Sequence, residues 1–388
     1  MVKVANLVFN SFKNDSRVLK ESISLADAGY DVEVIAHNDI GLKEYEIEKN
    51  FKIRRFSYLN REESKGIISK LGAYLKYIKS AVQHCKDFDI LHCNDLDTLP
   101  IAFIIKRFKN RNIKVVYDAH EHETERHHQT TFDKKILKIV EKFFLKYVDE
   151  VITVSEPIAD DYVNLYGIKK PTLIYNTPKK VSIKKKNIFR EKFNIPKEHI
   201  IFLYQGGLQP RRGILEFLEL VKNKKNISYV IMGFGELKEE ILKHVKNQPN
   251  LYFHDAVSPD VLLDYTSSAD IGVCIEENLC KSWDLALPNK MFEYAMVNLP
   301  IIVSGLSELK RFVLENNTGY VIEDIFDKSE FDKLFPEILK TYRSKDNDIK
   351  RVKEIYNWQN QEKKLLVLYK ELRKKQVGKP LKVGAVND

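Results

Sequence analysis

The stretch Ile201–Val221, IFLYQGGLQPRRGILEFLELV, predicts a β-strand that ends at Gly206 and Gly207 and a helix that follows within a few residues. Glycines let a backbone approach a ligand closely, and a helix N-terminus favours an anion. Arg211 and Arg212 add two positive charges at the same turn. This chemistry suits a diphosphate, although an ordinary strand-to-helix turn with solvated arginines has the same pattern.

Short β-rich runs alternate with amphipathic segments on both sides of this stretch, and a helix is predicted at 16–28. Strands separated by helices indicate a parallel sheet with right-handed crossovers. Because this alternation of strands and helices begins again at residue 199, the sequence predicts two Rossmann-like, doubly wound α/β domains that face each other across a cleft. The predicted strands are 2–9, 31–37, 89–93, 113–119 and 150–155, then 199–207, 227–233, 250–255, 270–275 and 300–305.

The predicted domain limits follow from the same alternation of strands and helices. An N-terminal domain covers residues 1–177 and a C-terminal domain covers 178–354, with a Pro- and Lys-rich linker at 177–189. A final helix at 357–372 joins the N-terminal domain. Residues 376–388 contain few apolar side chains and are expected to be disordered.

The composition is that of a soluble globular protein, with 44% hydrophobic and 31% charged residues. No secretory signal is visible, and no run approaches the roughly 18 apolar residues of a spanning helix, so a cytoplasmic location is expected. The four cysteines lack metal or disulfide spacing. A net charge of +9 favours acidic partners such as phosphorylated small molecules or anionic lipid. Nucleic acid is not expected, because basic and acidic residues are interleaved and no reader motif occurs.

A second candidate site lies in 285–305, LALPNKMFEYAMVNLPIIVSG. Pro288 and Asn289 open a predicted helix that carries Lys290 and Glu293 in its first turns. A lysine can meet phosphate oxygens, and a carboxylate can accept two hydrogen bonds from the hydroxyls of a ribose. The alternative is a surface ion pair between the two residues.

The chain resembles the retaining glycosyltransferases of family 4, which have the GT-B fold. The resemblance extends from about residue 4 to residue 369. It is carried by nine segments in the family's order: 12–36, 89–99, 115–121, 151–159, 173–178, 203–213, 230–237, 287–304 and 357–369.

The resemblance implies the roles of individual residues. The catalytic residues would be His120, Arg212 and Lys290, with Arg212 at the diphosphate. The donor nucleotide sugar would be bound by residues of the C-terminal domain: Gly206, Gly207, Arg212, Gly233, Val257, Leu287, Lys290 and Glu293. The acceptor-side loops would supply Asn14, Asp15 and Asp95. No metal and no cofactor are expected besides the nucleotide sugar itself.

The sequence departs from the family pattern at three places. Gly207 stands where the family often has an arginine, and Leu285 stands where it has the first of two glutamates. The lost contacts would then come from Asp284 or from backbone amides near Leu287. In the first loop, 11–17 (SFKNDSR) replaces a glycine pair.

Single motifs of the sequence also fit other enzyme classes. The pattern MGFGEL at 232–237 partly fits a dinucleotide fingerprint but lacks its third small residue. Asp95 and Asp97 form the D-x-D of metal-dependent transferases. In the run 118–128, DAHEHETERHH, His120 and His122 form an H-x-H that could bind a metal.

Two basic amphipathic stretches, 65–86 and 134–147, fit either sheet-covering helices or docking on an anionic membrane surface. The sequence therefore predicts a retaining, metal-independent hexosyltransferase, cytoplasmic or peripheral on the inner face of the membrane. A nucleoside diphosphate sugar, with UDP favoured, would be the donor. The acceptor would be a glycan or lipid-linked molecule in cell-surface polysaccharide or glycoconjugate synthesis. The alternative is a nucleotide-sugar-binding protein that has lost catalysis.

Overall fold

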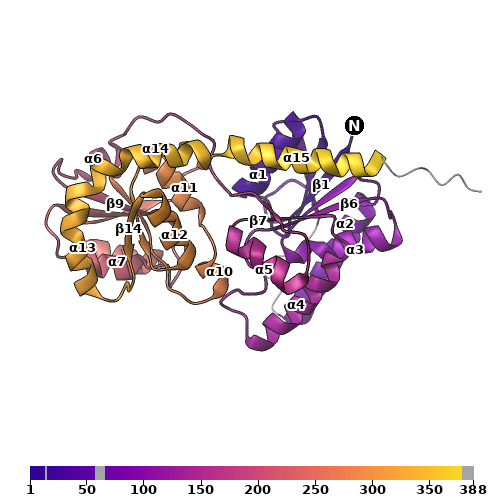
Figure 1. Cartoon of the computed structure of the whole chain (residues 1–388), viewed down its shortest axis with the longest axis horizontal. Coiled ribbons are helices and arrows are strands. Elements are labelled where there is room, and N and C mark those ends of the chain that lie inside the picture. The colour runs from indigo at the N-terminus through magenta and orange to yellow at the C-terminus, as the bar shows by residue number, and fades with distance from the viewer. Residues whose placement is uncertain (14, 57–65, 378–388) are drawn as a thin grey trace, which may run out of the picture. The chain divides into compact units, whose positions relative to one another are not determined.

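The computed structural model describes residues 1–13, 15–56 and 66–377, and the chain forms two compact units (Figure 1). Unit 1 contains Met1–Ile174 and the chain from Glu362 onward, and unit 2 contains Tyr175–Gln361. The division at Ile174 lies close to the boundary predicted after residue 177. The Lys-rich stretch 177–189, predicted as a linker, lies inside unit 2, where Lys185 Nζ donates to the carbonyl of Ala269 at 2.9 Å.

Unit 1 is built on an eight-stranded sheet with the order β3-β4-β2-β1-β5-β6-β7-β8, parallel except for the β3–β4 pair. Its elements are β1 (Lys3–Leu7), α1 (Ser16–Asp27), β2 (Asp31–His37), β3 (Tyr45–Glu48), β4 (Phe51–Phe56), α2 (Ile67–Cys85), β5 (Ile90–Asn94), the 3₁₀ turn η1 (Leu96–Thr98), α3 (Leu99–Phe108), β6 (Lys114–Ala119), α4 (Thr131–Leu145), β7 (Glu150–Thr153), α5 (Glu156–Tyr166), β8 (Thr172–Leu173) and most of α15 (Trp358–Val377).

Unit 2 is built on a six-stranded, fully parallel sheet with the order β11-β10-β9-β12-β13-β14. Its elements are α6 (Ile188–Phe193), β9 (Ile200–Gly207), α7 (Ile214–Val221), β10 (Ile227–Phe234), α8 (Lys238–Asn247), β11 (Leu251–Asp255), α9 (Pro259–Thr266), β12 (Ile271–Cys274), α10 (Lys281–Asp284), α11 (Asn289–Met296), β13 (Ile301–Ser304), α12 (Ser307–Asn316), β14 (Gly319–Ile322), α13 (Lys328–Thr341), η2 (Tyr342–Lys345) and α14 (Asp346–Ile355).

Both sheets are doubly wound, as predicted. In unit 2 one face is covered by helices that include α11, α12 and α14, and the other by α7 and α13. The strand order reverses between β1 and β5 in unit 1 and between β9 and β12 in unit 2. Ligands of such sheets bind at these switch points, beyond the carboxyl ends of the strands.

Some elements differ from the prediction. Strands β3, β4, β8 and β14 were not predicted; β3, β8 and β14 span only two to four residues each. The predicted final helix ended at residue 372, whereas α15 continues to Val377. Of the tail predicted to be disordered, 376–388, the first two residues belong to α15, so the prediction was wrong there. Residues 378–388 and Asn14 lie outside the described residues.

Unit 2 begins and ends at one hydrogen bond, from the backbone N–H of Tyr175 to Oε1 of Gln361 at 3.2 Å. Helix α15, yellow in Figure 1, then carries the chain into unit 1. There the Tyr369 hydroxyl lies 2.8 Å from Nδ1 of the buried His92. This contact fixes the C-terminal helix to the core of unit 1.

A group of fully buried charged side chains lies beside that contact. Arg17 donates from Nε and Nη2 to the two oxygens of Asp118, at 2.8 and 2.7 Å, and its Nε lies 3.3 Å from Glu21. His92 Nε2 is 3.5 Å from both acids. Burial, and secondly the charge of Asp118, raise the pKa of Glu21 to about 7. Asp118 keeps a pKa well below its ordinary value, because Arg17 outweighs the effect of burial.

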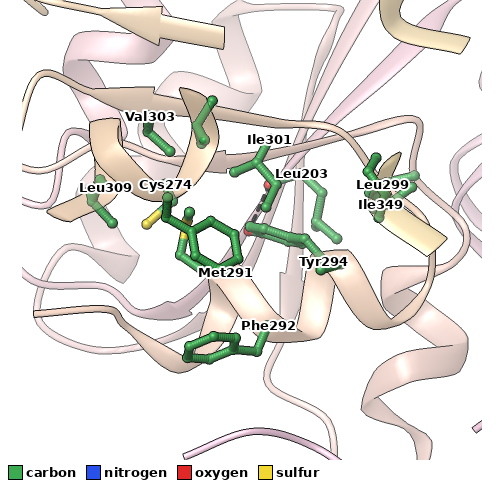
Figure 2. Packing of buried hydrophobic residues seen from close by; sticks show 14 of the residues in the cluster. Leu203, Cys274, Met291, Phe292, Tyr294, Leu299, Ile301, Val303, Leu309 and Ile349 are labelled. Atoms are coloured by element: carbon green, nitrogen blue, oxygen red, sulfur yellow. Dashed lines mark hydrogen bonds between the residues drawn. The ribbon is translucent and has the colours of Figure 1, made fainter. Parts of the chain in front are cut away.

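Helix α11 is held on the unit 2 sheet by Tyr294, which lies among Leu203, Ile301 and other core side chains in Figure 2. Its hydroxyl donates to the carbonyl of Leu203 at 2.9 Å and accepts from the backbone N–H of Gln205 at 3.1 Å. The ring covers Gly272 so closely that a Cβ there would lie 2.4 Å from ring carbons. Glycine at position 272 therefore allows α11 to pack against the unit 2 sheet.

The first prediction concerns Gly272→Ala. Because the added methyl group overlaps the buried Tyr294 ring, the free energy of unfolding should fall by about 1 to 3 kcal/mol. Gly72→Ala in α2 is the control, since a Cβ there meets nothing within 4 Å, and alanine favours the helix. Chemical denaturation measures both. Equal stability of the two variants would show that Tyr294 does not constrain this strand.

The second prediction concerns Glu21→Gln. A raised carboxyl pKa contributes stability that is present below the unfolded value of 4.5 and is lost as the pH rises through about 7. Wild-type stability should therefore decrease between pH 5 and pH 8 relative to the variant, by up to about 3 kcal/mol at 1.36 kcal/mol per pKa unit. The exposed Glu44→Gln is the control. Parallel pH profiles for wild type and Glu21→Gln would contradict the prediction.

Candidate active site

A pocket of about 380 Å³ lies in unit 2 at the carboxyl ends of β9, β10 and β11, against the start of α11. This is the switch-point side of the sheet. The lining residues are Tyr204, Gln205, Gly206, Gly207, Gln209, Arg212, Met232, Gly233, Phe234, Ala256, Val257, Leu262, Pro288, Asn289, Lys290 and Glu293.

Glycines form the floor of this pocket because two strands meet there without room for side chains. Gly206 of β9 has a φ of +129°, which favours glycine, and it pairs in register with Gly233 of β10. A Cβ on Gly233 would lie 1.9 Å from the carbonyl oxygen of Gly206. The backbone is thus open to a ligand at this edge of the sheet.

Arg212 follows β9 and projects its guanidinium over the ring of Trp283, 4.3 Å from the ring centroid. Its Nη1 donates to Oε1 of Glu276 at 2.5 Å. Burial alone would lower the pKa of Arg212, but the Glu276 carboxylate outweighs it and the pKa is raised. Arg212 is 30% exposed, so its charge is fixed in place and still reachable from the pocket.

Lys290 enters from the second residue of α11 and is more deeply placed, with 11% of its side chain exposed. Its Nζ lies 4.5 Å from the centroid of the Tyr204 ring and 3.5 Å from the same oxygen of Glu276 that binds Arg212. Two cations from distant parts of the sequence thus converge on one carboxylate. They give the pocket the character of an anion site.

Glu293 lies one helical turn after Lys290, on the same side of α11. Its Oε2 accepts from Gln205 Nε2 at 2.6 Å, and Gln205 Oε1 accepts from the Thr266 hydroxyl at 2.8 Å. This chain of hydrogen bonds fixes the carboxylate at the edge of the pocket. A carboxylate held in this way can bind vicinal hydroxyls.

The pocket brings together seven of the predicted donor-site residues: Gly206, Gly207, Arg212, Gly233, Val257, Lys290 and Glu293. Leu287 does not line it; this side chain is 7% exposed and belongs to the hydrophobic core beneath α11. The prediction missed Tyr204, Gln205, Glu276 and Trp283. Gln205 directly precedes the glycine pair, so its position next to the pocket was readable from the sequence, whereas Glu276 and Trp283 gave no such signal.

Asp284, named as a replacement for the missing glutamate, has another task. Its two oxygens accept from the backbone N–H and the hydroxyl of Ser307, each at 2.8 Å, at the start of α12. The carboxylate therefore binds the end of a neighbouring helix.

His120 lies in unit 1, directly after β6. Its Nε2 is 3.0 Å from Oδ1 of Asn94 and 3.5 Å from Asp118, and its Nδ1 is 3.7 Å from Asp95. Burial lowers the pKa of His120, but Asp95 and then Asp118 outweigh it and raise the pKa to about 10. The ring is therefore an imidazolium at neutral pH, a hydrogen-bond donor at both nitrogens and no base.

The two acceptor-side aspartates that the structure describes support their own unit. Asp95 Oδ1 accepts from the backbone N–H of His120 at 3.3 Å. Asp15 caps α1 by accepting from the Val18 N–H at 3.2 Å. Both therefore shape the loops at the switch point of unit 1.

The candidate metal motifs do not converge. His120 is directed at Asp95 and Asp118, whereas His122 Nε2 pairs with Asp161 at 2.8 Å. Within the described ranges, the acidic and histidine side chains close enough to share an ion are Glu21, His92 and Asp118. There the guanidinium of Arg17 already supplies the positive charge.

Comparison with known proteins agrees with this architecture. Residues 17–177 match the model of Glycosyltransferase Family 4, and residues 185–355 match that of Glycosyl transferases group 1. A search of curated protein sequences gave no match.

Solved structures with low sequence identity have the same fold. Sucrose-phosphate synthase from Thermosynechococcus elongatus has a TM-score of 0.78 at 16% identity, over 97% of this chain and 100% of that one. HepE from Anabaena, in complex with UDP-glucose, has a TM-score of 0.70 at 11% identity, over 96% and 100%. WaaG, a glycosyltransferase involved in lipopolysaccharide biosynthesis, has a TM-score of 0.63 at 13% identity, over 95% and 99%.

Two matched family models in tandem, two doubly wound parallel sheets and these structural neighbours lead to one conclusion: the chain belongs to the family 4 glycosyltransferases and has the GT-B fold.

Proposed function

We propose that this glycosyltransferase moves a hexose from a UDP-sugar to a glycan or lipid-linked acceptor, with retention of anomeric configuration and without a metal ion. The acceptor would belong to cell-surface polysaccharide or glycoconjugate synthesis. The observation that carries the proposal is the pair of cations, Arg212 and Lys290, at the glycine floor of the unit 2 pocket. UDP as the nucleotide is favoured by the structural neighbour HepE, which was crystallised with UDP-glucose and with UDP.

In the proposed mechanism the donor diphosphate lies on Arg212 and Lys290, and Glu293 accepts hydrogen bonds from the ribose hydroxyls. Negative charge grows on the diphosphate as the glycosidic bond breaks, and two preorganised cations stabilise that charge. A metal ion in the same place would be redundant, which supports metal independence.

Retention is proposed to proceed through an oxocarbenium-like state, with attack on the face from which the diphosphate departs. The carboxylates nearest the cations are already engaged, Glu276 with Arg212 and Glu293 with Gln205, which argues against a covalent nucleophile there. His120, as an imidazolium, would donate a hydrogen bond to the transferred sugar.

A peripheral position on the inner face of the cell membrane is part of the proposal. Within the described residues, no helix has the length and apolarity needed to span a bilayer. Helix α4 carries a stripe of exposed apolar side chains, in which Phe132 and Ile139 are each 70% exposed and Ile136 and Phe143 are 43% and 42% exposed. Lys135, Lys142 and Lys146 follow one side of this stripe. Of the two acids of α4, Glu141 is buried and accepts from the Tyr117 and Tyr162 hydroxyls, whereas Asp133 forms a capping box with Thr130.

Helix α2 repeats the pattern. Ile68, Leu71 and Leu75 are 87%, 55% and 56% exposed, and the helix carries lysines but no acidic residue. Helix α3 packs against both α2 and α4 in the same unit (Figure 1). Exposed apolar side chains beside lysines suit the boundary between lipid headgroups and acyl chains of an anionic bilayer.

The proposed function is tested by incubating the protein with a panel of nucleotide sugars in excess chelator and following release of nucleoside diphosphate. UDP should be released from one UDP-sugar, and NMR of the product should show the donor's anomeric configuration. A loss of turnover that Mn²⁺ or Mg²⁺ restores would instead indicate a metal-dependent transferase that uses Asp95 and Asp97. Binding of the donor without transfer or hydrolysis would identify a nucleotide-sugar-binding protein instead.

The third mutational prediction compares Arg212→Ala with Arg211→Ala. Removing Arg212 deletes a charge-assisted contact to the departing phosphate, so turnover should fall by roughly two to three orders of magnitude. Arg211 is 56% exposed and pairs with Glu277 outside the pocket, so its variant should keep nearly wild-type turnover. Similar losses in both folded variants would refute a specific role for Arg212.

The membrane surface is tested by flotation with vesicles of phosphatidylcholine, alone or mixed with phosphatidylglycerol. Wild type should float with the anionic vesicles, and Phe132→Ser with Ile139→Ser should bind them at least about 10-fold more weakly, because two apolar side chains no longer enter the bilayer. Leu314→Ser, which removes a 60% exposed apolar side chain in unit 2, is the matched control. Unchanged flotation of the double variant would exclude α4 as the docking surface.

A further inference from the structure

Glu276 is the acid nearest the two pocket cations, and no motif of the sequence pointed to it. It lies two residues after the end of β12, the strand where the sheet order reverses, and its side chain is 4% exposed. One of its oxygens lies 2.5 Å from Arg212 Nη1 and 3.5 Å from Lys290 Nζ. Its backbone N–H donates to the Ser304 hydroxyl at 3.0 Å, which fixes the residue on β13.

The neighbouring residue provides a contrast within the same turn. Glu277 pairs with Arg211 at 3.3 Å, and this arginine is 56% exposed. Neither residue lines the pocket. In one pair the arginine is therefore largely exposed, while in the other the carboxylate is buried and its arginine lines the pocket.

A buried carboxylate between two cations has two electrostatic effects. It keeps Arg212 and Lys290 together while the pocket holds no anion, because two like charges would otherwise repel each other at short range. It also cancels part of the attraction that a diphosphate would feel, and it repels the diphosphate directly in a site shielded from solvent. The second effect grows with the negative charge of the ligand.

We propose that Glu276 is an internal counter-ion of the donor site, a positioning residue that holds Arg212 and Lys290 in place and weakens the binding of the diphosphate group. This inference rests on the proposed function for the identity of the ligand. Its consequence is that the nucleoside diphosphate product leaves more readily than two unopposed cations would allow.

The test is calorimetry with UDP, inorganic pyrophosphate and uridine on wild type, Glu276→Gln and Glu277→Gln. Glutamine retains an acceptor for Arg212 but removes the charge. Glu276→Gln should bind UDP and pyrophosphate roughly 10-fold more tightly, since both carry negative charge. Its affinity for uncharged uridine should stay unchanged, and Glu277→Gln should match wild type for all three ligands.

The charge dependence separates this role from a purely structural one. A variant that merely disturbs the pocket would lose affinity for uridine as well. If Glu276→Gln binds UDP and pyrophosphate as wild type does, or more weakly, the counter-ion role is overturned.

A second comparison covers the case in which Glu276→Gln does not fold. Lys290→Met is compared with Lys290→Met/Glu276→Gln, in which Arg212, itself 30% exposed, is the one member of the Arg212–Lys290–Glu276 group that remains charged. The double variant should again bind pyrophosphate more tightly, and equal or weaker binding would overturn the proposal. Failure of UDP to bind wild type, with the pyrophosphate difference retained, would instead count against the proposed donor.

Discussion

The cationic pocket depends on the packing of the Tyr294 ring over Gly272. The Tyr294 hydroxyl bonds to the backbone of β9, the strand that ends in the glycine floor. The same tyrosine fixes the rotation of α11, which has only eight residues and no side-chain cap. The backbone positions of Lys290 and Glu293 therefore depend on this contact in the core, and Glu276 and Gln205 then hold their side chains.

Unit 1 contains a buried ion pair in addition to its apolar core. Arg17 and Asp118 form a buried pair with two parallel hydrogen bonds, and Asp118 in turn lies near His120. Breaking such a pair leaves an uncompensated charge in the interior, which costs several kcal/mol. The raised pKa of His120 depends first on Asp95 and then on Asp118, whose position Arg17 fixes.

Much of this architecture was predictable from the sequence because its signals are local. The glycine pair, the arginines after it and the lysine at the start of α11 are each readable within one strand–turn–helix unit, and the doubly wound fold follows from the alternation of such units.

Contacts between distant segments were not predictable. Glu276 stands seventeen positions before Glu293 (293 − 276), and only the sheet order β9-β12-β13 brings it under Arg212 and Lys290. Likewise, Arg17 gave no sign of its pairing with Asp118, since a hundred residues separate them and the family pattern has glycines nearby. Leu287 was wrongly assigned to the pocket, because neighbouring residues at the start of a helix point in different directions. The Leu287 side chain belongs to the hydrophobic core.

The hydrogen bond between Tyr175 and Gln361 joins the first and last residues of unit 2. Unit 2 is therefore a continuous segment inserted into unit 1, and its two ends meet. Such a segment can be exchanged between related chains as one cassette without cutting any strand of the recipient sheet. The candidate donor pocket lies wholly within this inserted segment, so an exchanged cassette would carry the whole pocket with it. Removal of the C-terminal helix α15 would destabilise unit 1, because His92 Nδ1 would lose its contact with the Tyr369 hydroxyl.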